Sequence, residues 1–147
     1  YKGFDLSMFW QGVYDKDVYN NQKFQTDFWS ITDAGSNKGN RLLGAWNTNN
    51  TGSTIPALTT NNTADEGRSS TYFVENGSYL KLRNLQLGYN LPASFLSKFK
   101  MSSARVYLSG QNLLTIKSKS LTCSDPENPD WNYPLATSIS FGLQLGF

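Results

Sequence analysis

The chain ends on a strict two-residue alternation. From Ser138 onward every second residue is small or polar, and each residue between is large and apolar. The small or polar set is Ser138, Ser140, Gly142, Gln144 and Gly146, and the apolar set is Ile139, Phe141, Leu143, Leu145 and Phe147. A period of two places the two sets on opposite faces of a strand. The ending therefore predicts a β-strand over residues 136–147 whose apolar face continues to the last residue.

Three further segments alternate in a similar way and predict three more strands. They are residues 3–14, 78–91 and 104–116. The second segment is irregular, because Leu80 and Leu82 have one parity whereas the leucines from Leu85 onward have the other. An unbroken strand would turn part of these leucines to the wrong face. We therefore expect a β-bulge near Arg83 and Asn84.

The connections between these strands differ greatly in length, at about 60, 12 and 18 residues. If neighbouring strands are antiparallel, the two long connections lie at one end of the sheet, and the short turn and the C-terminus lie at the other. Bacterial transmembrane β-barrels have this asymmetry, and each predicted strand is long enough to cross a bilayer. A soluble β-sandwich also alternates, with its apolar stripe facing a second sheet. Both folds are all-β, and periodicity alone leaves both open.

The composition argues against most catalytic chemistry. The chain has no histidine, which is the commonest metal ligand and acid–base group, and its net charge is +2 with scattered basic residues. We expect no nucleic-acid partner, no cofactor, no metal and no catalytic site. The single cysteine, Cys123, excludes an internal disulfide, and we expect it to be an inert thiol on an exposed loop.

Several strings, in a fixed order, identify a family resemblance that spans nearly the whole chain. They are FDLSMFWQGVYDKDVYN (4–20), YFVENGSYLKLRNLQLGYNLP (72–92), RVYLSGQNLLT (105–115), DPENPDWNYP (125–134) and ISFGLQLGF (139–147). Together they resemble the C-terminal part of SusC/RagA-type TonB-dependent outer-membrane transporters. The resemblance implies that residues 1–147 are the last four antiparallel strands of a 22-stranded transmembrane barrel, with long extracellular loops and a short periplasmic turn.

The same resemblance implies a function and a set of partners. Such transporters import glycans or peptides across the Gram-negative outer membrane, with energy relayed by TonB and with a SusD-like lipoprotein that captures nutrients. The plug domain, the TonB-contacting segment and the earlier strands lie outside this chain. The expected partners are the rest of the barrel and its plug, the lipoprotein, TonB, the barrel assembly machinery and membrane lipid. The alternative is a soluble, secreted β-sandwich that binds glycans.

The resemblance also suggests roles for particular residues. On the closing strand, lipid would face Ile139, Phe141, Leu143, Leu145 and Phe147, with Phe147 at the periplasmic side as part of an assembly signal. The lumen would face Arg105, Tyr107, Ser109 and Gln111, which would either contact the plug and line its route or simply be solvated. Sugar rings would stack on loop aromatics, with Trp46, Trp131 and Tyr133 as candidates beside Trp29. Packing within the loops, or an aromatic girdle at the lipid headgroups, is the alternative for these rings.

Overall fold

A computed structural model describes residues 1–28, 37–61, 65–130 and 132–147. Four long strands dominate: β1 (Phe4–Val13), β4 (Tyr79–Asn90), β5 (Ser103–Lys117) and β6 (Ser138–Gly146). The short elements are β2 (Asp17–Tyr19), α1 (Gln22–Asp27), η1 (Asn40–Gly44), η2 (Thr71–Phe73), β3 (Val74–Asn76), α2 (Ala93–Leu96) and η3 (Ser97–Phe99). No helix within these ranges has the length and apolar character needed to cross a membrane. Three of the four spans predicted to be strands contain a long strand, and β5 extends one residue beyond its predicted span at each end.

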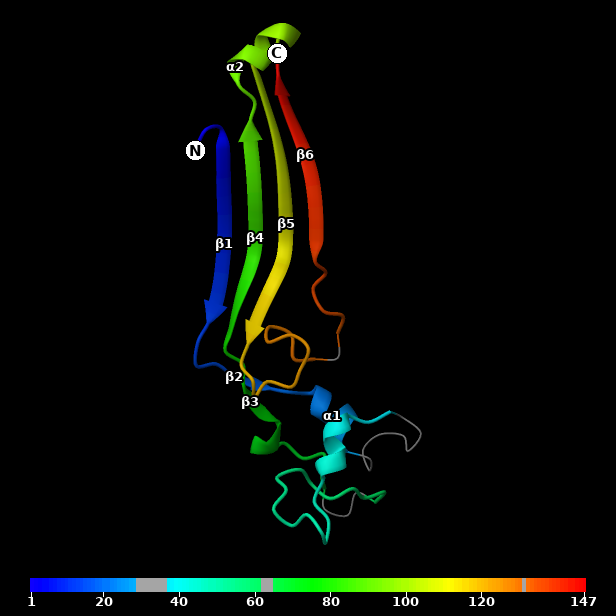
Figure 1. The fold of residues 1–147 in the computed structure, drawn as a ribbon. Helices are drawn as coiled ribbons and strands as arrows, with labels where there is room; N and C mark the ends of the chain where they lie inside the picture. Colours follow the sequence, from blue (N-terminus) through cyan, green and yellow to red (C-terminus); the bar gives the residue numbers. More distant parts are fainter. Residues whose placement is uncertain (29–36, 62–64, 131) are drawn as a thin grey trace. The chain divides into compact units, whose positions relative to one another are not determined.

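The four long strands form one antiparallel sheet in the order β1-β4-β5-β6 (Figure 1). Its register is set by a row of paired residues, in which Phe4 lies opposite Tyr89, Tyr89 opposite Val106 and Val106 opposite Leu143. Because side chains alternate along each strand, every residue in this row points to the same face. The described residues hold only one other sheet, the pair β2-β3.

The bulge expected in β4 is present. Opposite β1, the pairs Phe9–Asn84 and Trp10–Leu82 leave Arg83 as the extra residue of β4. This insertion reverses the parity of β4, so the leucines on both sides of Arg83 point to one face. The alternation in the sequence therefore located the bulge correctly.

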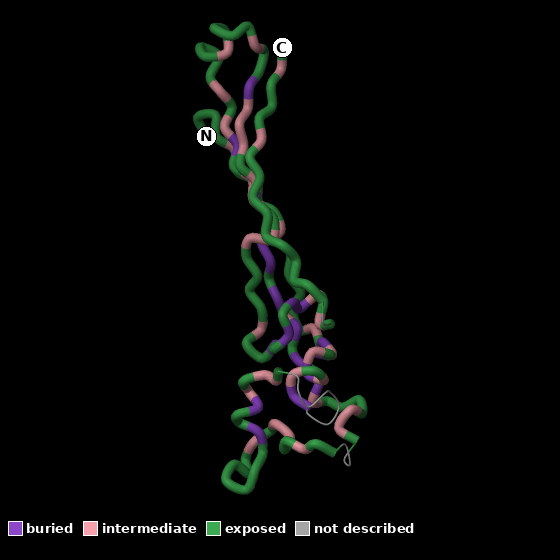
Figure 2. Tube along the Cα trace, turned by 90° about the vertical axis from the view of Figure 1, so that its right-hand side faces the viewer, coloured by how far each residue is buried: buried purple, intermediate pink, exposed green. Residues whose placement is uncertain are grey.

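As a result the sheet has one continuous apolar face. Its members are Phe4, Leu6, Met8 and Trp10 of β1, Leu80, Leu82, Leu85, Leu87 and Tyr89 of β4, Val106, Leu108, Leu114 and Ile116 of β5, and Ile139, Phe141, Leu143 and Leu145 of β6. Much of this face is bare, with Phe141 75% exposed, Ile139 70% and Leu6 61%. Figure 2 shows mostly exposed and intermediate residues along the strands. Within the described ranges no second sheet covers this face, as a sandwich would require.

Short and long connections leave from opposite ends of the sheet. Between β4 and β5 the chain makes only α2 and η3, and the turn closes at Lys100, whose φ of 53° is left-handed. Gly146 pairs with Ser103 beside this turn, so the C-terminus lies at the same end (Figure 1). The two long connections begin at the other end, after β1 and β5. This is the asymmetry expected from the connection lengths.

The two long connections together form a second compact unit, made of residues 16–77 and 119–133. Its apolar centre is a group of aromatic rings around Phe73, which is fully buried. Phe24 stacks on Phe73 at 4.2 Å between ring centroids, and Tyr19 and Phe28 approach it at 5.4 and 5.5 Å. The sequence predicts long loops here, with short local structure near Tyr19 to Phe28, and the described parts also pack around a core of their own.

Cys123 lies inside this second unit, contrary to the expectation of an exposed thiol. Its side chain is fully buried beside Val18 and Leu121, and its thiol donates to the carbonyl oxygen of Asp125 at 3.4 Å. The surrounding residues are polar in sequence, so nothing local predicted burial. The contact with Val18, more than a hundred residues earlier, buries the thiol.

Candidate functional site

The face opposite the apolar one carries a polar bridge across three strands. On β5, Arg105 reaches over β4 to Asp5 on β1, with Nη2–Oδ2 and Nε–Oδ1 distances of 2.6 and 3.1 Å. The bridge crosses directly above Gly88, where an added Cβ would overlap both charged groups. Gln86 of β4 completes it once its amide is turned, because its oxygen then accepts from the same guanidinium. The absence of a side chain at Gly88 is what gives Arg105 its path to Asp5.

Tyr107 uses a second glycine in the same way. Its ring lies over Gly142 of β6, and a Cβ at that position would overlap the ring. The Arg105 guanidinium carbon lies 5.3 Å from the ring centroid, within range of a cation–π interaction. Both large side chains thus lie along the sheet. Ser109 and Gln111 continue this face along β5.

A second arginine bridge lies at the bulge. Arg83 donates from Nε to the Gln11 side chain of β1 at 2.9 Å and from Nη1 to the Asn112 side chain of β5 at 3.2 Å. Asn112 has a φ of 52°, a left-handed conformation that asparagine tolerates better than most residues. The bulge therefore places a cation between two strands that are not neighbours. The sequence predicts only an irregularity of the strand at Arg83.

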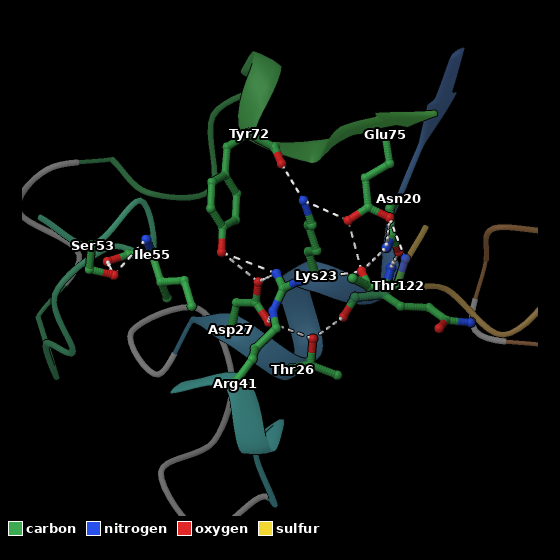
Figure 3. A network of polar contacts seen from close by, with 11 residues as sticks. Asn20, Lys23, Thr26, Asp27, Arg41, Ser53, Ile55, Tyr72, Glu75 and Thr122 are labelled. Carbon is green, nitrogen blue, oxygen red and sulfur yellow. Dashed lines mark hydrogen bonds and ion pairs between the residues drawn. The ribbon is translucent and has the colours of Figure 1, made fainter. Parts of the chain in front are cut away.

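The second unit contains a buried network centred on Glu75 of β3 (Figure 3). Its carboxylate accepts from Lys23 Nζ at 2.8 Å, from Asn20 Nδ2 at 2.9 Å, and from both the backbone N–H and the hydroxyl of Thr122 at 2.8 Å. Burial by itself would raise the pKa of Glu75, but these hydrogen bonds hold that pKa below its ordinary value. Glu75 is thus a stable anion whose carboxylate oxygens already accept several hydrogen bonds within the network.

A second ion pair adjoins the first. Asp27 of α1 pairs with Arg41 of η1 and accepts the Tyr72 hydroxyl at 2.6 Å (Figure 3). Burial raises the pKa of the Tyr72 hydroxyl by more than the nearby Arg41 cation lowers it. Lys23 Nζ lies 4.5 Å from the centroid of the Tyr72 ring, so one aromatic side chain contacts both ion pairs. These groups are positioned to hold loop segments together rather than to transfer protons.

Of the candidate sugar-stacking aromatics, the structure describes Trp46 and Tyr133. Trp46 is 43% exposed beside a hollow that Leu43 and Leu58 also line, and its backbone N–H donates to the Ile55 carbonyl at 2.9 Å. Tyr133 is 98% exposed. Trp29 and Trp131 lie outside the described residues. Sugar stacking thus stays a prediction for Trp46 and Tyr133.

Sequence reasoning missed the partners of both networks. Asp5 and Arg105 are a hundred residues apart, and Glu75 and Thr122 are 47 apart. The only available signal was that Gly88 and Gly142 fall among the small residues of the polar face. That signal indicates close contacts but does not say which side chains make them.

Comparisons with known proteins agree with the sheet and its loops. No family model matches the chain. TonB-dependent receptor P3 of Formosa agariphila is 36% identical over 118 residues, which cover 78% of this chain and 11% of that protein. The chain belongs to the SusC/RagA-type TonB-dependent receptors. TonB-dependent receptor P26 of the same organism is 29% identical over the whole chain, which covers 16% of that receptor.

Solved structures also match this receptor segment. The RagAB peptide transporter matches with a TM-score of 0.75 and 32% identity, over 99% of this chain and 16% of that one. The RagAB peptide importer matches in its "closed-closed" state with a TM-score of 0.76 and in its "open-open" state with 0.74, at 31% identity in both. The segment therefore spans about one sixth of these structures, and its TM-score is nearly the same against both states.

Proposed function

We propose that this receptor segment forms the last four strands of a large transmembrane barrel, and that the whole protein imports glycans or peptides across the Gram-negative outer membrane. The observation that carries the proposal is the bare apolar face of the sheet, opposite a face of bridged arginines, glycines and hydroxyls. In a bilayer the apolar face meets lipid, and the polar face meets the water-filled or plugged interior. Membership of the receptor family supports both the barrel fold and the import function.

By this proposal the two faces of the closing strand contact different surroundings, lipid on one side and the barrel interior on the other, and the strand runs toward the periplasm. Ile139, Phe141, Leu143, Leu145 and Phe147 face lipid, while Arg105, Tyr107, Ser109 and Gln111 of the neighbouring strand face the lumen. The short turn and the C-terminus lie at the periplasmic side, and the second unit is extracellular. Phe147 belongs to the signal read by the barrel assembly machinery. Deleting it from the full-length protein lowers the amount of folded, heat-modifiable receptor in outer membranes; an unchanged amount would contradict this role.

The partners follow from the same proposal. The name of the matched RagAB structures states a peptide transporter, and the resemblance implies a SusD-like lipoprotein on the extracellular side. TonB acts through the plug, which belongs to the part of the protein outside this segment. With no second sheet over the apolar face among the described residues, the soluble glycan-binding sandwich has no observation in its favour.

Growth of a strain that lacks the full-length gene tests the proposed function. We expect the deletion strain to lose growth on either oligopeptides or oligosaccharides as the sole source, and to recover it when the intact gene is restored. A matched strain without TonB should show the same loss. Normal growth of the deletion strain on every polymer that the parent uses would refute import as the function.

A further inference from the structure

The second unit is built from two connections that are far apart in the sequence. Residues 16–77 join β1 to β4, and residues 119–133 join β5 to β6. In many barrels each such loop extends by itself from the ends of its two strands. Here the described parts of both connections share one apolar cluster, in which Val18 packs against Leu121 and Cys123.

Glu75 and Thr122 form the centre of the junction between the two connections. Glu75 accepts two hydrogen bonds from Thr122, both at 2.8 Å, and is itself paired with Lys23. The Thr122 hydroxyl also accepts from Asn20 at 2.9 Å. Separating the connections would leave the buried, charged Glu75 without its Thr122 donors, and loss of donors to a buried charge is strongly unfavourable.

A second row of contacts flanks this centre. The Gln22 side chain exchanges two hydrogen bonds with Ser124, at 3.0 and 3.2 Å, and Asn21 donates to Asp130 at 2.6 Å. Lys16 donates to the Pro126 carbonyl at 3.3 Å. The contacts extend from residue 122 to residue 130, so the shorter connection is held along most of its length and not at one point.

We propose that the described parts of residues 16–77 and 119–133 move as one rigid body during import, with Glu75 and Thr122 holding the two connections together. This inference rests on the proposed function for its setting. The hydrogen bonds that join the two connections from residue 122 to residue 130 support it, because they would all have to break for the connections to separate. Opening of the extracellular mouth then comes from other parts of the assembly.

Hydrogen exchange of the full-length receptor, followed by mass spectrometry, tests the coupling without any substrate. Glu75→Gln keeps the shape of the side chain but removes its charge, so exchange rises about tenfold in residues 20–27 and 119–124 together. Asp17→Asn is the matched control, since it removes a carboxylate from the neighbouring strand β2 without a role in the junction. Faster exchange confined to residues 74–76, with wild-type protection at 119–124, would overturn the proposal.

A cross-link tests whether the two connections ever separate during import. Asn21→Cys with Asp130→Cys places two thiols at a pair of exposed side chains already in contact. Buried Cys123 is protected from reagent, and each single cysteine variant serves as a control. After treatment with a short bismaleimide, we expect growth that depends on the receptor to remain unchanged. Loss of growth only in the cross-linked double variant would overturn the proposal, whereas a deletion strain with no growth defect would refute the import function and leave the exchange result standing.

Discussion

At the scale of single residues, glycines decide how the large polar side chains of the sheet lie. Gly88 and Gly142 are not needed for unusual backbone angles, because each sits within an extended strand. Each instead removes the Cβ that would block a neighbour, so that Arg105 crosses to Asp5 and Tyr107 lies along β6. The arginine and tyrosine side chains therefore lie along the polar face near the short turn instead of projecting from it.

The bridge between Asp5 and Arg105 predicts a charge-dependent coupling. Asp5→Asn or Arg105→Gln in the full-length receptor lowers by a few degrees the temperature at which the barrel loses its compact mobility in gel electrophoresis. Gly88→Leu produces a similar loss without removing either charge, because its side chain blocks the crossing. The double variant Asp5→Asn, Arg105→Gln loses little more than either single variant. Additive losses would show that the two side chains do not act as a pair.

At the scale of elements, the bulge in β4 keeps the two faces of the sheet distinct. Without Arg83 as an extra residue, Leu80 and Leu82 would point to the polar face. The bulge also supplies the cation that contacts Gln11 and Asn112. This one inserted residue therefore keeps the leucines of β4 on one face and adds an arginine that contacts the strands on both sides of β4.

The faces of β6 predict opposite responses to the same substitution. Leu143→Arg places a charge on the face proposed to contact lipid, which costs about 2–4 kcal/mol near the bilayer centre and reduces the folded receptor recovered from outer membranes. Ser140→Arg, opposite Ser109 on the neighbouring strand, places the same charge on the polar face and leaves recovery near that of the wild type. Equal recovery of the two variants would contradict the assignment of the faces.

At the scale of the whole molecule, the two units are stabilised by different chemistry. The sheet exposes its apolar side chains and keeps its polar bridges on the other face. The second unit buries ionic groups, namely Lys23, Asp27 and Glu75, beside an aromatic cluster. Buried carboxylates tie the stability of the second unit to their protonation, whereas the sheet holds the buried Lys81 and the bridge from Arg105 to Asp5, whose carboxylate side chain is 40% exposed.

This difference predicts that acid loosens the second unit before the sheet. The pKa of Glu75 is lowered in the folded state, so its contribution to stability is present above the pKa of the unfolded chain and is lost as the pH falls through the folded value. Protection from hydrogen exchange at residues 119–124, measured relative to the intrinsic exchange rate, should therefore fall once the pH drops below the ordinary pKa of glutamate, while the strands stay protected. In Glu75→Gln this pH dependence should largely disappear. Persistence of the full pH dependence in that variant would assign it to another group.

Local periodicity was sufficient to predict the strands because it depends only on residues that are close together in the sequence. The span of β6, the parity change at Arg83 and the ends from which the connections leave all follow from alternation and from connection lengths. Arg105, Tyr107, Ser109 and Gln111 share the polar face for the same reason, and their place in a lumen stays a prediction. The partners of Arg105, the burial of Cys123 and the small sheet β2-β3 did not follow, since each depends on residues far away in the chain.

By itself, the terminal stripe of Ile139, Phe141, Leu143, Leu145 and Phe147 determined that the chain ends in a strand with one apolar and one polar face. The tertiary structure alone decided that this face continues unbroken over four strands and remains bare, because that depends on register and on what packs against the sheet. It also decided that two polar connections, which show no sustained period in the sequence, share one core. A period of two follows from the geometry of one strand, whereas the contact of Glu75 with Thr122 exists only once the chain has folded.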